Sequence, residues 1–154
     1  IVVIGLRDSL WMEEGVSELE VEDIGGRVWG GNSVVIYVWC ETSTNVILVG
    51  RFADRLGGFL IGSIELTRLR MGVGRDSGAL AELFDESNDA VKWMIATVIE
   101  KAHQTGSHVG LCGQAPSNNP AFARFLVEAG IDTISVTPDS FIAVKEHVAA
   151  AEKG

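Results

Sequence analysis

Short apolar runs alternate with segments of helical periodicity along this chain, a pattern typical of parallel α/β folds. Because strands joined through helices pair in parallel by right-handed crossovers, the pattern predicts a parallel sheet within one domain or part of one. Residues 13–33 are rich in glycine and show no persistent stripe, although a helix is expected there between the first two strands. The runs expected to form strands are Ile1–Leu6, Val34–Cys40, Phe59–Gly62, Val109–Leu111 and Ile131–Val136.

Helical periodicity is clearest in Thr44–Leu56, Asp85–Thr105 and Phe141–Ala151. The first of these segments is followed by Gly57 and Gly58, which favour a helix stop. The second is the longest, and apolar residues recur along it three or four positions apart, as on a helix that packs one face on a core. That stripe consists of Val91, Met94, Ile95, Val98 and Ala102.

The segment from residue 107 to residue 138 carries the most specific local signals. Cys112 ends one apolar run and is followed by Gly113 and a stretch of turn-forming residues. Asn119 is expected to N-cap a helix that begins at Pro120, and Gly130 is expected to end it before the last strand. The apolar face of this helix would contain Phe122, Phe125, Leu126 and Ala129.

The charge and the hydropathy of the chain exclude two classes of partner. A formal net charge of −9 and the absence of a basic run argue against a nucleic-acid surface. No apolar stretch approaches the roughly 18 residues that a membrane helix needs, and no signal peptide is visible, so we expect a cytoplasmic protein without a membrane segment. Because the chain opens with Ile1 inside a strand pattern, we expect it to be a fragment of a longer protein.

The cysteines and histidines give no sign of a disulfide or of a clustered metal site. A cytosolic location favours free thiols for Cys40 and Cys112. If Glu41 points inward from the end of its strand, Cys40 points to the opposite, helix-packed face and is a buried core thiol. The histidines lie singly, without the spacing of metal ligands, and are expected to be structural: His103, His108 and His147.

Four segments together resemble one known family. Residues 109–139 read VGLCGQAPSNNPAFARFLVEAGIDTISVTPD, residues 59–78 read FLIGSIELTRLRMGVGRDSG, and residues 37–47 read YVWCETSTNVI. These resemble the CGQ loop with its S-x-x-PD strand end, the IGS-N-D-LTQ strand and loop, and the CE-x-x-SNV segment of the phosphoenolpyruvate synthases (pyruvate, water dikinases). The opening IVVIGLRDS is similar to a strand of that family which ends in an arginine-containing loop.

The resemblance implies a fold and places the candidate site residues within it. The fold would be the C-terminal part, about strands 4 to 8, of the (β/α)₈ barrel that binds pyruvate and phosphoenolpyruvate (PEP), with residues 1–154 forming one partial domain. In such barrels the chemistry lies where strands end and βα loops begin. Arg7, Glu41, residues 63–65 and Cys112 each follow an apolar run, so the hydrophobic pattern itself places them at that end.

The resemblance also implies chemical roles. Cys112 matches the cysteine that exchanges a proton with the methyl carbon of pyruvate. Glu41 and Glu65 match the family's glutamate and aspartate ligands of Mg²⁺, and carboxylate oxygens are the donors that this ion prefers. Glu65 is one methylene longer than the family's aspartate, which matters because Mg²⁺ demands near-ideal octahedral geometry.

The remaining candidate substrate-binding residues follow the family less evenly. Gly62 and Ser63 match its pattern and could offer backbone and hydroxyl contacts. Ile64 stands where the family has asparagine, and isoleucine has neither a donor nor an acceptor in its side chain. Arg7 could bind a carboxylate or phosphate in a bidentate manner, although an ordinary surface arginine is the alternative.

The implied function is that of the C-terminal pyruvate- and PEP-binding part of a phosphoenolpyruvate synthase, which makes PEP from pyruvate and ATP. The nucleotide-binding and phosphohistidine domains of such an enzyme, and the first three barrel strands, are absent from these residues. The expected cofactor is Mg²⁺, and the expected assembly is a homodimer. Two alternatives stay open: a non-catalytic barrel remnant that serves as a dimerisation or interaction module, and an unrelated small α/β binding protein.

Overall fold

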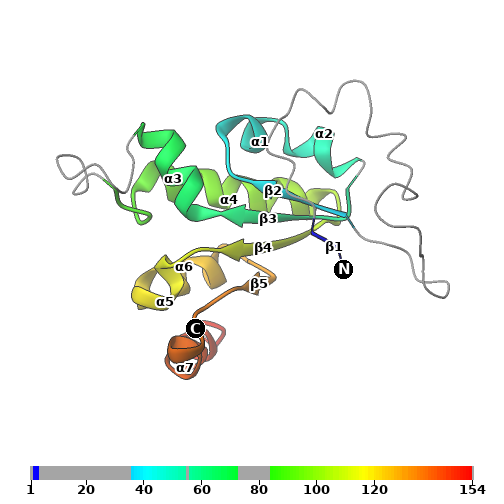
Figure 1. Cartoon of the computed structure of the whole chain (residues 1–154). Helices are drawn as coiled ribbons and strands as arrows, with labels where there is room; N and C mark the ends of the chain where they lie inside the picture. The colour runs from blue at the N-terminus through cyan, green and yellow to red at the C-terminus, as the bar shows by residue number, and fades with distance from the viewer. Residues whose placement is uncertain (1, 4–35, 55, 73–83, 154) are drawn as a thin grey trace.

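A computed structural model describes residues 2–3, 36–54, 56–72 and 84–153 of the chain. Within these residues one parallel sheet of five strands runs through the molecule, and its strand order is β1-β2-β3-β4-β5 (Figure 1). The strands are β1 (Val2–Val3), β2 (Ile36–Cys40), β3 (Gly58–Gly62), β4 (His108–Cys112) and β5 (Thr133–Ile134).

The strand order separates this sheet from the common open α/β sheets. Every strand pairs in parallel with the next one along the chain. A doubly wound sheet reverses its strand order at a switch point, whereas here the order never reverses. Right-handed crossovers that always step in one direction place the helices on a single face, which is the arrangement of a (β/α)₈ barrel.

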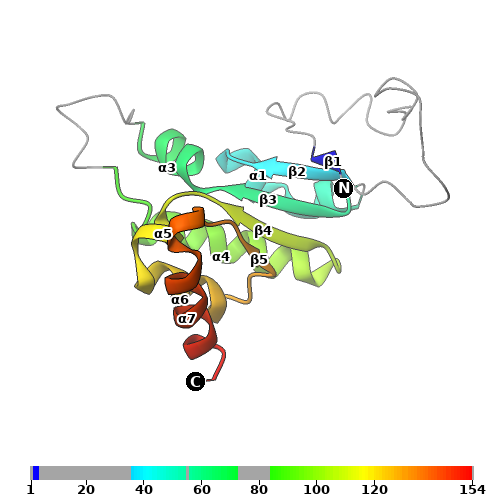
Figure 2. The ribbon, with the colours of Figure 1, turned by 60° about the horizontal axis from the view of Figure 1, so that its bottom comes forward.

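The helices connect and cover these strands (Figures 1 and 2). α4 packs on β3 and β4 and also contacts α1, α2 and α3, while α6 and α7 pack on each other. The helices are α1 (Ser43–Ile47), α2 (Val49–Ala53), α3 (Ser63–Met71), α4 (Asp89–Gln104), α5 (Ala115–Asn118), α6 (Pro120–Glu128) and α7 (Phe141–Ala151), and a 3₁₀ turn, η5 (Pro138–Ser140), precedes α7.

Two helix predictions were wrong in detail. The single helix expected over Thr44–Leu56 is two short helices, because Leu48 leaves helical geometry at φ −99° and ψ 16°. The long helix expected from Asp85 begins four residues later, since Asn88 is its N-cap and accepts a hydrogen bond from the Ala90 N–H. Local capping by Asn88 decided the start of the long helix, and hydrophobic periodicity does not report on a cap.

Two strand-end predictions also need correction. The loop expected after the third strand run is a helix, α3, which starts at Ser63 without an intervening loop residue. The last strand covers only Thr133–Ile134, within the predicted Ile131–Val136. β5 pairs with β4 at just these two positions, and the hydrogen bond from the Ser135 N–H to the Leu111 carbonyl ends the ladder.

The signals around α6 are confirmed. The Asn119 side chain accepts hydrogen bonds from the Ala121 and Phe122 N–H groups, and Pro120 is the first helical residue. Gly130 has a φ of 86°, the left-handed conformation that favours glycine after a helix end. Of the predicted apolar face, Phe122 and Leu126 are fully buried, whereas Phe125 and Ala129 are partly buried against the core.

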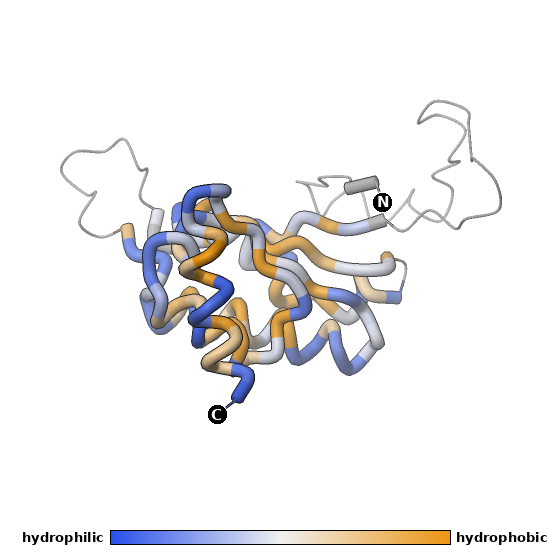
Figure 3. Tube along the Cα trace, turned by 90° about the horizontal axis from the view of Figure 1, so that it is seen from below, coloured by the Kyte–Doolittle hydropathy of each residue, from blue (hydrophilic) through white to orange (hydrophobic). Residues whose placement is uncertain are grey.

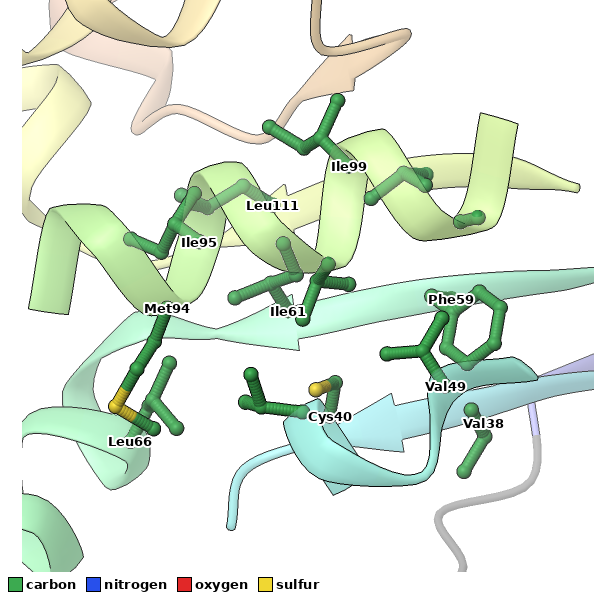
Figure 4. Close-up of a cluster of buried hydrophobic side chains, with 14 of the residues drawn as sticks. Val38, Cys40, Val49, Phe59, Ile61, Leu66, Met94, Ile95, Ile99 and Leu111 are labelled. Carbon is green, nitrogen blue, oxygen red and sulfur yellow. The ribbon is translucent and has the colours of Figure 1, made fainter. Parts of the chain in front are cut away.

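Alternation along the strands divides their side chains between two faces. One face packs under the helices and is fully buried, as the close-up of the core shows (Figure 4). Burying one such apolar side chain typically contributes about 1.5–3 kcal/mol, so this layer dominates the stability of the sheet. The strand residues on this face are Val38, Cys40, Phe59, Ile61, Val109 and Leu111.

The other face of the sheet corresponds to the inside of a barrel and combines aromatic rings with glycines. The Tyr37 and His108 rings meet edge to face, with centroids 5.7 Å apart. They lie on β2 and β4, and Gly58 on the strand between them leaves the space that the Tyr37 ring fills. A side chain at Gly110 would likewise come within 2.6 Å of the Thr133 hydroxyl. The strands can therefore curve closely around this face only because glycine occupies these positions.

The hydrophobic stretches of the trace gather on the central strands and the helix faces against them (Figure 3). None of the helices in the described residues is long and apolar enough to cross a membrane.

Asp132 joins the end of α4 to the strand β4. Its Oδ2 accepts a hydrogen bond of 2.7 Å from the Val109 N–H and lies 3.0 Å from Nε2 of His103. Burial alone would raise the pKa of this carboxyl. The hydrogen bonds from His103 and Val109, with the nearby charges of His103 and His108, outweigh burial and hold the Asp132 pKa below its usual value.

Asp132→Ala is expected to lower the free energy of unfolding at pH 7 by about 1–3 kcal/mol, because the Val109 N–H loses its side-chain acceptor. A carboxyl whose pKa is lowered by folding stabilises the protein above its unfolded pKa of about 4, and that contribution is lost as the pH falls through the folded pKa. The difference between variant and wild type in urea titrations should therefore shrink on acidification. Asp139→Ala, at an exposed aspartate, is the control, and an equal effect of both variants would contradict the role of Asp132.

Candidate active site

The parallel register brings the carboxyl ends of three strands to one place. Cys40, the last residue of β2, pairs with Ile61, and Gly62, the last residue of β3, pairs with Cys112, the last residue of β4. The residues that follow these strand ends therefore meet at one edge of the sheet. In a (β/α)₈ barrel this edge is the mouth at which active sites form.

Glu41 is the first residue after β2 and is largely buried, with 9% of its surface exposed. Its backbone N–H donates to Oδ1 of the buried Asn45 over 3.3 Å. The same oxygen accepts from the Thr42 N–H at 3.1 Å and from the Thr42 hydroxyl at 2.7 Å. This capping box at the start of α1 fixes the turn that presents the Glu41 carboxylate.

Because Gly62 has no side chain, the side chains of Trp39 and Glu41 can lie over the end of β3. A Cβ at this position would come within 2.9 Å of Cγ of Glu41 and within 2.7 Å of Nε1 of Trp39. Both side chains thus press against the Gly62 backbone. The Trp39 Nε1 atom is buried and has no hydrogen-bond partner in the described part of the chain.

Ser63 is fully buried, and its hydroxyl donates a 2.5 Å hydrogen bond to Oε1 of Glu86. Gly113 lies against both groups, because a Cβ there would come within 3.0 Å of Glu86 Oε1 and 3.2 Å of Ser63 Cβ. Glu86 therefore connects the end of β3 to the loop after Cys112. Helical periodicity from Asp85 had placed Glu86 inside a helix, so its role at the site was not predicted. The run Ser87-Asn88-Asp89, rich in N-cap residues, is the signal that the helix begins later.

The start of α3 adds backbone donors to this edge. Gly62 is its N-cap and offers no side-chain hydrogen bond, so the first-turn N–H groups have no side-chain acceptor at the cap. Such a helix end attracts anions, through these N–H groups and through the helix dipole. The Ser63 hydroxyl gives its proton to Glu86 and can only accept from a ligand while that bond holds.

The other predicted site residues are Glu65, Ile64 and Arg7. Oε2 of Glu65 lies 3.4 Å from Nη1 of Arg68 in an ion pair along α3, and its side chain is 35% exposed. Ile64 is half-buried in the same turn. The sharing of one ion by Glu41 and Glu65 stays a prediction, and Arg7 lies outside the described residues.

A magnesium site is compatible with the donors at this edge. Within residues 36–54, 56–72 and 84–153, no group of three or more histidine, cysteine, aspartate and glutamate side chains is gathered around one point. Mg²⁺ usually takes only one or two protein carboxylates and completes its shell with water and substrate oxygens. The buried carboxylate of Glu41 is the donor here that suits this requirement best.

The two cysteines have opposite surroundings, as predicted, and neither is in a disulfide. Cys40 lies in the core under the helices, where burial first and the charge of Glu41 second raise the pKa of its thiol to about 12. Cys112 is half-buried at the end of β4, at the same edge as Glu41 and Ser63. The Cys112 thiol is thus the one placed to exchange a proton with a bound molecule.

Comparison with known proteins gives matches to one family. A family model described as "PEP-utilising enzyme, PEP-binding domain" matches residues 12–153. The chain is 47% identical to the phosphoenolpyruvate synthase of Aquifex aeolicus over 92% of its length, and 50% identical to that of Synechocystis over 83%. Each match covers 16% of the relative, so the chain spans about a sixth of the length of these curated relatives.

A solved structure supports the fold. The β subunit of citrate lyase from Mycobacterium tuberculosis matches with a TM-score of 0.57 and 16% identity, covering 75% of this chain and 52% of that one. Likeness at this identity concerns the fold alone. Together with the sequential parallel sheet it confirms the predicted fold class, α/β with part of a (β/α)₈ barrel.

Thiol titration tests the placement of the two cysteines. A disulfide reagent should modify one thiol of the native chain rapidly, and the second only in denaturant, because Cys40 is buried and its high pKa leaves little thiolate. Cys112→Ser should remove the rapid phase. Two rapid phases in the native chain would contradict the burial of Cys40.

A second substitution tests the close approach at Gly62. Gly62→Ala should destabilise the fold by about 1–3 kcal/mol, since the new methyl group overlaps the Trp39 and Glu41 side chains. Gly50→Ala is the matched control: a Cβ at Gly50 meets no atom within 4 Å, so alanine in this helix should be neutral or stabilise by up to about 1 kcal/mol. Equal unfolding midpoints in urea for the two variants would show that Gly62 is not tightly enclosed.

Proposed function

The chain belongs to the PEP-utilising enzymes, in their PEP-binding domain, and from this premise we propose that it is the C-terminal pyruvate- and PEP-binding part of a phosphoenolpyruvate synthase. The observation that carries the proposal is the convergence of Glu41, Ser63 and Cys112 at one edge of a parallel sheet. In this proposal the parent enzyme makes PEP from pyruvate and ATP through a phosphohistidine domain outside these residues.

Glu41, with Glu65 as its proposed partner, would hold Mg²⁺. When bound, Mg²⁺ acts as a Lewis acid that polarises a carbonyl and stabilises developing negative charge. Burial of Glu41 keeps competing water away from its carboxylate and strengthens its attraction for a cation. Glu65 would have to exchange its ion pair with Arg68 for this role.

The chain's own groups account for substrate binding and proton transfer. The first-turn N–H groups of α3 would bind the carboxylate of pyruvate, as helix N-termini bind anions. The thiolate form of Cys112 would accept a proton from the methyl carbon as the enolate forms, and the thiol would return it in the reverse direction. Ser63, held by Glu86, would accept a hydrogen bond from a water molecule at the site, since pyruvate and its enolate offer only acceptors.

The rest of the parent enzyme is also part of the proposal. It would supply the nucleotide-binding domain, the phosphohistidine domain and the first barrel strands, and the whole would act as a cytoplasmic homodimer. Arg7 is retained as a further candidate contact to the substrate.

A second candidate function is a non-catalytic barrel that serves as an interaction module. Two observations favour it: Ile64 offers no polar group where the family has asparagine, and Glu65 is engaged with Arg68. The placement of Cys112 beside the Gly62 strand end favours the catalytic function instead, since an interaction module has no need of a thiol there.

Exchange of the methyl protons of pyruvate with deuterium oxide separates these functions. In the full-length protein with Mg²⁺, Cys112→Ser should slow this exchange by about 10²–10⁴-fold, the usual contribution of a positioned acid/base group. Oxalate binding should stay within about twofold of wild type, because the substitution leaves the α3 terminus and Glu41 in place.

Cys40→Ala is the matched control, which should retain exchange because Cys40 faces the helices. Undiminished exchange in Cys112→Ser would remove Cys112 from the mechanism. Absence of both exchange and PEP formation in the wild type would favour the interaction module.

A further inference from the structure

The indole N–H of Trp39 is a buried donor without an acceptor. Its Nε1 atom is closed off from solvent, and it has no hydrogen-bond partner in the described part of the chain. Native structures pair nearly all buried polar groups, because an unpaired buried donor loses its hydration without compensation. An acceptor that comes and goes, such as a ligand, explains why a protein keeps such a donor.

The position of this donor points to the site already described. Trp39 lies on β2, two residues before Glu41, which directly follows the strand, and both side chains press on Gly62. The residue after Gly62 opens α3. The indole N–H is thus adjacent to the Glu41 carboxylate and to the helix start, where the proposed substrate would bind.

The chemistry of indole restricts what it can bind. Its N–H is a donor only, so it cannot ligate a cation and requires an acceptor such as a carboxylate, carbonyl or enolate oxygen. In the described part of the chain, two hydroxyl donors that follow β2 and β3 are already engaged, and one polar position is missing. The Ser63 hydroxyl donates to Glu86, the Thr42 hydroxyl donates to Asn45, and Ile64 has no polar group.

We propose that Trp39 is a substrate-binding residue, whose Nε1–H donates a hydrogen bond to an oxygen of a small 2-oxo acid or its enolate. It supplies the side-chain donor that Ile64 lacks, from the neighbouring strand. This inference rests on the proposed function, because it takes the ligand of the mouth to be a pyruvate-like anion.

Three variants of the full-length protein test it by equilibrium binding of oxalate, and by the KM for pyruvate, with Mg²⁺ present. Trp39→Phe keeps an aromatic ring but removes the N–H, so oxalate should bind at least about tenfold more weakly, as expected for a lost hydrogen bond to a charged group. Trp39→His restores a ring N–H and should recover part of the affinity. Trp93→Phe, at a tryptophan that is 66% exposed on α4, should bind as wild type does.

A second measurement observes the Trp39 indole in the wild-type sequence and uses a variant for assignment only. In full-length protein labelled with 5-fluorotryptophan, the Trp39 ¹⁹F resonance, assigned by its absence in Trp39→Phe, should shift when oxalate is added, and the Trp93 resonance should not. A Trp39 resonance unmoved by saturating oxalate, or Trp39→Phe with wild-type affinity, overturns the inference while leaving the proposed function intact. If calorimetry with wild-type protein shows that neither oxalate nor pyruvate binds, both the proposed function and this inference fail.

Discussion

The register between β2, β3 and β4 is the constraint on which the rest of the structure depends. It sets the last residues of these strands side by side, so that groups distant in sequence meet at one edge. Gly62 is a point of close approach in that arrangement, because the side chains of Trp39 and Glu41 occupy the space that a Cβ would need. A shift of one residue in the register would send Glu41 and Cys112 to the helix-packed face and bury their chemistry.

The same edge shows how structural and chemical roles are divided between neighbouring residues. Cys40 and Glu41 are adjacent, yet one thiol is enclosed in the core with a raised pKa while the next carboxylate faces the mouth. Glu86 has a connecting role, since its hydrogen bond with Ser63 joins the start of α3 to the segment before α4 beside Gly113. The site therefore depends on a carboxylate that comes from outside the strand ends.

The departures from the family pattern also have a physical interpretation at this edge. Ile64 removes a polar side chain from the first turn of α3, and Glu65 pairs with Arg68 along the same helix. Trp39, from the adjacent strand, brings a buried donor to the same region. The donor lost at Ile64, on α3, and the donor gained at Trp39, on β2, lie in the same region. Such an exchange can preserve ligand binding while a different oxygen of the ligand is held.

The sequence by itself determined the strand–helix order, the parallel sheet, the cap of α6 at Asn119 and the opposite faces of Cys40 and Glu41, because these follow from periodicity and local capping. It placed Glu41, Ser63 and Cys112 at strand ends for the same reason. Only the tertiary structure decided the break at Leu48, the immediate start of α3 at Ser63, and the meeting of Ser63 with Glu86 and of Trp39 with Gly62. Those contacts depend on strand register and on the space left by glycines, which act between residues far apart in the chain and leave no periodic trace in it.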